Sequence, residues 1–211
     1  HSTSRRQRQM CIRDSFNSME SFSILSSEVL CKLNALKVDK SPGPDQIHPK
    51  VLYELRYELY ESLTILFNQS LELGIVPDIW KSSIVKVIFK KGAKDSISNY
   101  RPISLTCIVC KILESIIRDR LMEYMKQNSL FSDYQFGFIK GRSIALQLLG
   151  IVDEWTRVLD EHGQVDVIYT DFEKAFDKVP HKRLLSKLYS YGINESIINL
   201  IKSFLCDRTQ V

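Results

Sequence analysis

The stretch VDVIYTDFEKAFDKVP, residues 165–180, contains the pattern that bears most directly on the fold. Its first part, Val165–Thr170, is rich in β-branched and aromatic residues and predicts a strand. Asp171 follows at the C-terminal end of that strand, where α/β-type folds place reactive groups and metal ligands. A divalent cation such as Mg²⁺ needs oxygen ligands of this kind. From spacing alone, a structural and a functional role for Asp171 are equally open. We expect Asp166 to be solvated, and Asp177 to be either a local cap or a ligand.

Hydrophobic periodicity on both sides of this stretch predicts more helices than strands. The expected strands are residues 84–89 and 101–105, which would pair as a hairpin around the turn at 90–92. The expected helices are residues 29–36, 51–71 with Gly74 as the cap, 108–125, 144–160, Pro180 to Gly192, and Asn194 to about Cys206. The predicted class is therefore α+β, or mixed α/β.

The composition is that of a globular protein. Of the 211 residues, 44% are hydrophobic and 26% are charged, which excludes a disordered chain, a collagen-like chain and a disulfide scaffold. The number of cysteines is odd and no long apolar run or signal peptide is present, so we expect an intracellular protein with reduced thiols. Residues 1–25 are expected to be a disordered or artefactual leader.

A cluster of positive charge lies in the predicted hairpin. Residues 81–101 contain one acid, Asp95, and six cations: Lys81, Lys86, Lys90, Lys91, Lys94 and Arg101. The net charge of the whole chain, by comparison, is only +4. Such a cluster suits phosphate groups. The alternative is a solvated edge strand whose lysines discourage aggregation. The cluster by itself does not decide between the two.

Two other groups of residues invite a chemical interpretation. Cys107 and Cys110 have zinc-like spacing, but no second pair of ligands is nearby, so buried thiols are expected at the start of a helix. His48 and His181 each lie beside a proline and are expected to be structural. The loop QFGFIKGRS, residues 135–143, offers aromatic, glycine and cationic residues to a nucleic-acid strand, although an aromatic-anchored structural loop would look similar.

The order of these patterns resembles the reverse transcriptase domain of non-LTR (LINE- and jockey-type) retrotransposons, from about residue 26 to Val211. Five blocks carry the resemblance: KSPGPD at 40–45, WK at 80–81 with IFKKG at 88–92, NYRPISL at 99–105, QFGF at 135–138 with GRS at 141–143, and YTDFEKAFD at 169–177 with VPH at 179–181. Two positions depart from the family pattern. Ile139 stands where a basic residue is usual, and Ile144 where a threonine is usual.

The resemblance implies a role for each matching residue. Asp171 would be the first catalytic aspartate and, with the Phe172 backbone, a ligand of the divalent metals. The residues implied to bind the deoxynucleoside triphosphate are Lys90, Lys91, Arg101, Phe172, Ala175 and Phe176. The residues implied to position the template are Gln135, Gly137 and Arg142. The ring of Phe176 would exclude a ribose 2′-hydroxyl.

The resemblance also implies a right-hand polymerase fold, with fingers over 26–164 and the first part of the palm over 165–211. The reaction would be nucleotidyl transfer with two Mg²⁺ or Mn²⁺ ions. RNA template, DNA primer and deoxynucleotides are the expected partners, in the nucleus or cytoplasm, with no membrane and no organic cofactor.

The Asp-Asp pair that forms the family's second metal-binding block does not occur in the 211 residues. We therefore expect a piece of a larger polymerase that is inactive by itself. Two alternatives stay open: a catalytically dead remnant that at most binds nucleic acid, and a redox or zinc module built on Cys107 and Cys110.

Overall fold

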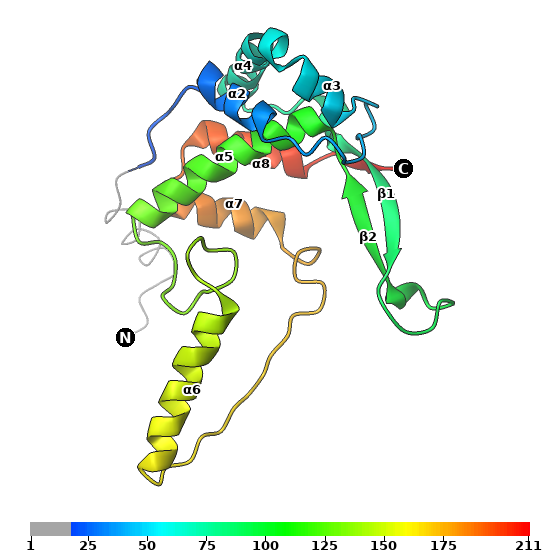
Figure 1. The fold of residues 1–211 in the computed structure, drawn as a ribbon. Helices are drawn as coiled ribbons and strands as arrows, with labels where there is room; N and C mark the ends of the chain where they lie inside the picture. Colours follow the sequence, from blue (N-terminus) through cyan, green and yellow to red (C-terminus); the bar gives the residue numbers. More distant parts are fainter. Residues whose placement is uncertain (1–17) are drawn as a thin grey trace. The chain divides into compact units, whose positions relative to one another are not determined.

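The computed structural model describes residues 18–211. These residues form two compact units. Of the described residues, the first unit joins those from 18 to 124 with Pro180–Val211, and the second unit is Met125–Val179. The elements, labelled as in Figure 1, are α2 (Ser26–Asn34), α3 (Pro49–Glu54), α4 (Arg56–Leu73), β1 (Ser82–Phe89), β2 (Tyr100–Leu105), α5 (Ile108–Gln127), α6 (Ile144–Asp160), α7 (His181–Ser190), α8 (Glu195–Leu205) and β3 (Thr209–Gln210).

The described strands form one small sheet in the first unit, in the order β2-β1-β3. The antiparallel pair β1–β2 confirms the predicted hairpin, and its register runs from Ile84 opposite Leu105 to Phe89 opposite Tyr100. Figure 1 shows this hairpin extending away from the helices of its unit. The parallel strand β3 was not predicted, because two residues carry no readable alternation.

The predicted strand at Val165–Thr170 is wrong. This segment has no regular secondary structure, and it lies in the second unit with almost every side chain exposed. A strand forms only when a neighbouring strand takes up its backbone N–H and C=O groups. Among the residues that the structure describes, no strand lies beside this segment, so its β-branched composition is not sufficient.

The predicted helix over 51–71 is two helices. Pro49 begins α3, and the imidazole of His48 accepts a hydrogen bond from the Lys50 amide, so His48 is structural as expected. The chain leaves the helical conformation at Leu55, where ψ is 18°, and α4 then begins. Gly74 ends α4 in the left-handed conformation, with φ at 64°, which confirms the predicted cap.

The core of the first unit lies where α2, α4, α5 and α8 meet. The apolar face of α5 is buried as its periodicity predicted, and the ring of Phe67 on α4 lies edge-on to Trp80 with centroids 6.0 Å apart. Burying one large apolar side chain contributes about 1.5–3 kcal/mol. The buried side chains of these helices are Val29, Leu33, Phe67, Leu71, Ile108, Ile112, Leu113, Ile116, Ile117, Ile197 and Leu200.

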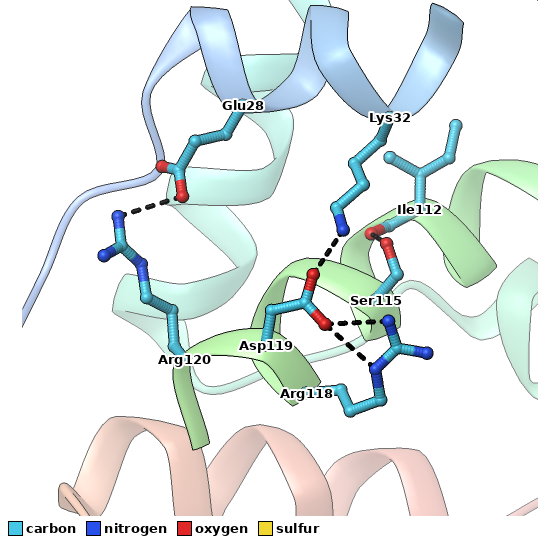
Figure 2. A network of polar contacts seen from close by, with 7 residues as sticks. All are labelled: Glu28, Lys32, Ile112, Ser115, Arg118, Asp119 and Arg120. Atoms are coloured by element: carbon cyan, nitrogen blue, oxygen red, sulfur yellow. Dashed lines mark hydrogen bonds and ion pairs between the residues drawn. The ribbon is translucent and has the colours of Figure 1, made fainter. Parts of the chain in front are cut away.

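Ion pairs tie α2 to the polar side of α5 (Figure 2). The Lys32 ammonium contacts the Asp119 carboxylate, which also accepts two hydrogen bonds from the Arg118 guanidinium. One turn earlier on α2, Glu28 pairs with Arg120 at 2.9 Å. Charged residues on the polar side of α5 therefore connect it to α2.

Residues 18–25, which the sequence assigned to the leader, contact the core. The Met19 amide donates to the Gly192 carbonyl oxygen at 2.8 Å, and Ile24 is buried. The Asn68 side chain accepts a hydrogen bond from the Ile24 amide and donates one to the Ile24 carbonyl. The rest of the predicted leader, residues 1–17, lies outside the described residues.

The second unit consists of α6 and the loops on both sides of it. The Ser143 hydroxyl caps α6 by accepting a hydrogen bond from the Leu146 amide, and the helix covers the predicted range 144–160. In the first unit, the two C-terminal helices also follow the prediction, with Pro180 and Asn194 as their N-caps. No described helix has the length and hydrophobicity that crossing a membrane requires.

Candidate functional site

The β1–β2 hairpin displays positive charge on an exposed surface. Lys86 lies opposite Ile103 and Arg101 lies opposite Ile88, so the register places these two cations on the same face. The Lys90 amide donates to the Asn99 carbonyl oxygen at 2.8 Å, which extends the ladder into the turn.

Five of the six predicted cations of this hairpin are exposed and, among the residues that the structure describes, form no ion pair: Lys86, Lys90, Lys91, Lys94 and Arg101. Lys81 differs, since its ammonium pairs with Asp78 at 3.1 Å. Exposed cations without an ion-pair partner are available to phosphate groups.

The turn that supports the hairpin is ordered by polar contacts. Gly92 has a φ of 95°, and a Cβ there would lie 2.7 Å from the Asn99 side-chain nitrogen. The Asn99 side chain donates to the Ala93 carbonyl, and the Tyr100 hydroxyl donates to the Lys94 carbonyl. These bonds hold Lys90 and Lys91 at a defined end of the hairpin.

Asp171 lies in the second unit, on an exposed stretch that leads into the turn at 173–178. Phe172, just before this turn, and Phe176, within it, are 81% and 80% exposed. The Lys178 amide donates to the Lys174 carbonyl at 3.0 Å, which closes the turn. Ala175 is exposed as well, so the residues implied to line a bound nucleotide all face solvent.

Metal ligation needs several oxygen ligands around one ion. Among the described residues, no group of three or more histidine, cysteine, aspartate or glutamate side chains has an arrangement that would hold a metal ion. Asp166 lies on the same exposed stretch and accepts a hydrogen bond from the Gln164 side chain. The donor set around Asp171 therefore does not fit two divalent ions without further ligands.

The residues implied to position a template come together in one loop of the second unit. The Gln135 amide group donates to the Gly137 carbonyl at 3.4 Å. The Arg142 guanidinium donates to the carbonyl oxygens of Ser132, Asp133 and Gln135, at 2.8, 3.1 and 2.6 Å. The guanidinium is thus engaged in closing the loop, and contact with a template stays a prediction for all three residues.

One aromatic contact in the second unit was not predicted. The rings of Phe138 and Phe176 lie perpendicular to each other with centroids 6.2 Å apart. The sequence shows Phe138 within the block at 135–138 but gives it no role, because the two residues are 38 positions apart and nothing local connects them.

The predicted nucleotide residues are divided between the two units. Lys90, Lys91 and Arg101 belong to the first unit, whereas Asp171 and Phe176 belong to the second.

The two neighbouring cysteines are buried as predicted. Cys107 is fully buried, Cys110 is 2% exposed, and the Cys110 thiol contacts a Glu114 carboxylate oxygen at 3.1 Å. Burial raises the pKa of both thiols, and the negative charge of Glu114 adds to the effect at Cys110. Redox catalysis and zinc binding need thiolates, so this environment disfavours both.

A cavity of about 590 Å³ lies in the first unit but contains none of the predicted site residues. Its lining comes from the segment before α2, from α4 and from the start of α8: Ser21, Phe22, Ser23, Asn68, Leu71, Glu72, Asn194, Ser196 and Ile197. Its polar groups include Asn68, whose side chain already holds Ile24.

Comparison with known proteins shows that the chain is similar to part of the polymerases of mobile elements. The family model "Reverse transcriptase (RNA-dependent DNA polymerase)" matches residues 88–211. A probable RNA-directed DNA polymerase from the transposon BS of Drosophila melanogaster is 30% identical over 188 residues, which cover 86% of this chain and 20% of that protein. The RNA-directed DNA polymerase from the mobile element jockey of the same organism is 29% identical over 183 residues, again 86% of this chain and 20% of that protein.

The chain spans about a fifth of the length of these two relatives. A third relative, a probable RNA-directed DNA polymerase from the transposon X-element of Drosophila melanogaster, is 30% identical over 79% of the chain and 18% of its own length. The resemblance to jockey-type elements is therefore confirmed. Because the family model covers more than half of its residues, this chain belongs to the reverse transcriptase (RNA-dependent DNA polymerase) family.

Proposed function

We propose that this chain is part of an RNA-directed DNA polymerase of a mobile element, which adds deoxynucleotides to a primer 3′-hydroxyl on an RNA template. The observation that carries the proposal is the family match across residues 88–211, which includes Lys90, Lys91 and Arg101 of the hairpin as well as Asp171. In this proposal, residues 26–164 form the fingers of a right-hand polymerase and residues 165–211 begin its palm.

In this proposal, the exposed residues of the hairpin and of the segment 172–176 bind the deoxynucleoside triphosphate. Arg101 and a lysine of the Lys90–Lys91 pair hold the triphosphate, since a guanidinium can contact two phosphate oxygens at once. The backbone from Phe172 to Phe176 lines the nucleotide, and the Phe176 ring excludes a 2′-hydroxyl. Protein groups of this kind contribute position and charge rather than covalent chemistry.

Asp171 is proposed as one carboxylate ligand of a divalent-cation site. Two bound cations would stabilise the negative charge on the attacking and leaving oxygens in the transition state of nucleotidyl transfer. The donor set of the described residues does not hold two ions by itself. The complete two-metal site therefore needs an Asp-Asp pair of the kind that these 211 residues lack.

The consequence is that the 211-residue chain alone should not polymerise. A primer-extension assay on the purified chain with an RNA template and Mg²⁺ or Mn²⁺ is expected to give no templated incorporation. In an intact element protein that contains this chain, incorporation is expected, and Asp171→Asn should abolish it. Asp166→Asn, on the same exposed stretch, is the matched control and should retain activity. Incorporation by the isolated chain that Asp171→Asn removes would contradict the proposed inactivity.

A second candidate function is a non-catalytic nucleic-acid-binding module, favoured by the five exposed cations of the hairpin. Binding to an RNA–DNA hybrid should weaken with added salt and with the double change Lys90→Ala and Arg101→Ala. The control double change Lys37→Ala and Lys50→Ala removes two exposed lysines outside the hairpin and should have a smaller effect. Equal losses from both pairs would point to non-specific attraction.

The proposed substrates also suggest where the protein acts. An RNA template, a DNA primer and deoxynucleotides occur together inside the cell, so we propose the nucleus or the cytoplasm. Fractionation of cells that express the intact element protein, followed by detection of the chain, tests this proposal.

A further inference from the structure

An exposed pair of aromatic rings links the two loops of the second unit. Phe138 and Phe176 meet edge to face with their ring planes at 90°, an arrangement that the ring quadrupoles favour. Phe138 is 88% exposed and Phe176 is 80% exposed. Large apolar rings are usually buried, so a ring contact maintained in solvent calls for an explanation beyond core packing.

The backbone on both sides of the contact is unusual. Phe138 has a φ of 63° and Lys174, two residues before Phe176, has a φ of 50°. Residues with a Cβ avoid this left-handed conformation, and it persists where the surrounding structure enforces it. Conformational strain of this kind concentrates at ligand-binding sites.

Each of the two loops is held by its own hydrogen bonds. Around Phe138, the Arg142 guanidinium binds three carbonyl oxygens and the Arg142 amide donates to the Ile139 carbonyl at 3.2 Å. Around Phe176, Lys178 closes the turn through its amide and through an ion pair with Glu173 at 2.5 Å. The loops thus bring the two rings together without help from a buried core.

We propose that Phe138 is a positioning residue that holds the Phe176 ring in the orientation from which it distinguishes deoxyribose from ribose. An exposed phenylalanine without a ring partner can turn about two side-chain torsions, and steric exclusion by such a ring is weak. The edge-to-face contact restricts these torsions. The inference rests on the proposed function, because it assigns Phe138 to the same nucleotide site as Phe176.

The test is nucleotide selection by an intact element protein that contains this chain. The ratio of kcat/KM for a deoxynucleotide to that for the matching ribonucleotide is measured in single-nucleotide primer extension. Phe138→Ala should lower the ratio about two- to ten-fold, the range that an aromatic pair contributes. Phe138→Leu keeps the apolar bulk without the ring and should lower it as well, whereas Phe138→Tyr should preserve it.

Tyr134→Ala is the matched control. Tyr134 lies in the same loop and is 89% exposed, but within the described part of the chain its ring makes no ring contact, so the ratio should not change. An unchanged ratio in both Phe138→Ala and Phe138→Leu would overturn the inference, as would an equal loss of activity toward both nucleotides. If the unsubstituted protein fails to incorporate any nucleotide, the proposed function is wrong and the inference falls with it.

Discussion

Gly43 lies directly against the backbone of Cys107, so that a Cβ at residue 43 would be 2.6 Å from the Cys107 amide nitrogen. The same Cβ would be 2.6 Å from the Thr106 carbonyl carbon. Backbone atoms cannot turn aside as the end of a flexible side chain can. The turn at 40–45 therefore packs against the junction between β2 and α5, and the space at residue 43 requires glycine.

Gly43→Ala should lower the free energy of unfolding by about 1–3 kcal/mol, because the added methyl group forces a backbone shift. Urea denaturation monitored by circular dichroism measures this change. The control is Gly150→Ala in α6, where a Cβ meets nothing within 4 Å. Alanine favours a helix over glycine by up to about 1 kcal/mol, so this variant should be as stable or more stable. Equal destabilisation in both variants would exclude the packing explanation.

Asn68→Ala should destabilise the first unit by about 1–3 kcal/mol, since it leaves backbone groups of the buried Ile24 without their partners. The Asn68 side chain accepts from the Ile24 amide at 2.8 Å and donates to the Ile24 carbonyl at 2.9 Å. Asn68→Asp keeps the acceptor and loses the donor, so an intermediate loss is expected. Thermal unfolding compares both variants with Asn34→Ala, an exposed asparagine at the end of α2, which should have little effect.

Acid should weaken the link between α2 and α5. Burial acts to raise the pKa of Asp119, but hydrogen bonds from Lys32 and Arg118 outweigh it and lower the pKa below the ordinary 3.8. A carboxyl group with a lowered pKa stabilises the fold above its unfolded pKa, and this contribution is lost as the pH falls through the folded value. The stability advantage of the unsubstituted chain over Asp119→Asn should thus be present at pH 7 and decrease as the pH falls below 3.8.

The Lys32–Asp119 pair is partly exposed, with 26% and 49% of the two side chains accessible. A double-mutant cycle of Lys32→Met and Asp119→Asn should therefore give a coupling energy of only about 0.2–1 kcal/mol. The coupling should decrease in 1 M salt. A coupling energy that is large and independent of salt would show that the two residues interact by packing rather than by charge.

Glu114 should respond to pH in the opposite direction. Burial raises the pKa of the Glu114 carboxyl above the ordinary 4.5, and the Cys110 hydrogen bond and the charges of Arg208 and Lys111 offset only part of this effect. A raised pKa means that the stabilising contribution is present below the unfolded pKa and is lost as the pH rises through the folded value.

Glu114→Gln removes this titration and keeps an acceptor for the Cys110 thiol. Its stability relative to the unsubstituted chain should therefore rise as the pH increases from 4 to 8. Urea denaturation across this range tests the prediction. A stability difference that does not vary with pH would show that the carboxyl is solvated.

The sequence by itself determined the elements whose signals are local. The apolar face of α5, the caps at Gly74 and Asn194, and the β1–β2 hairpin all follow from periodicity, capping chemistry and a short turn. The order of motifs along the chain also determined the family, which the match over residues 88–211 confirms.

Tertiary structure decided the features that need a partner distant in sequence. The segment at Val165–Thr170 has the composition of a strand but no neighbour that pairs with it, whereas Thr209 and Gln210 lack a strand pattern and yet pair with β1. The contact between Phe138 and Phe176 depends in the same way on two loops folding toward each other. Composition sets what a segment can form, but backbone pairing and ring contacts need two segments at once, and only the folded chain brings these together.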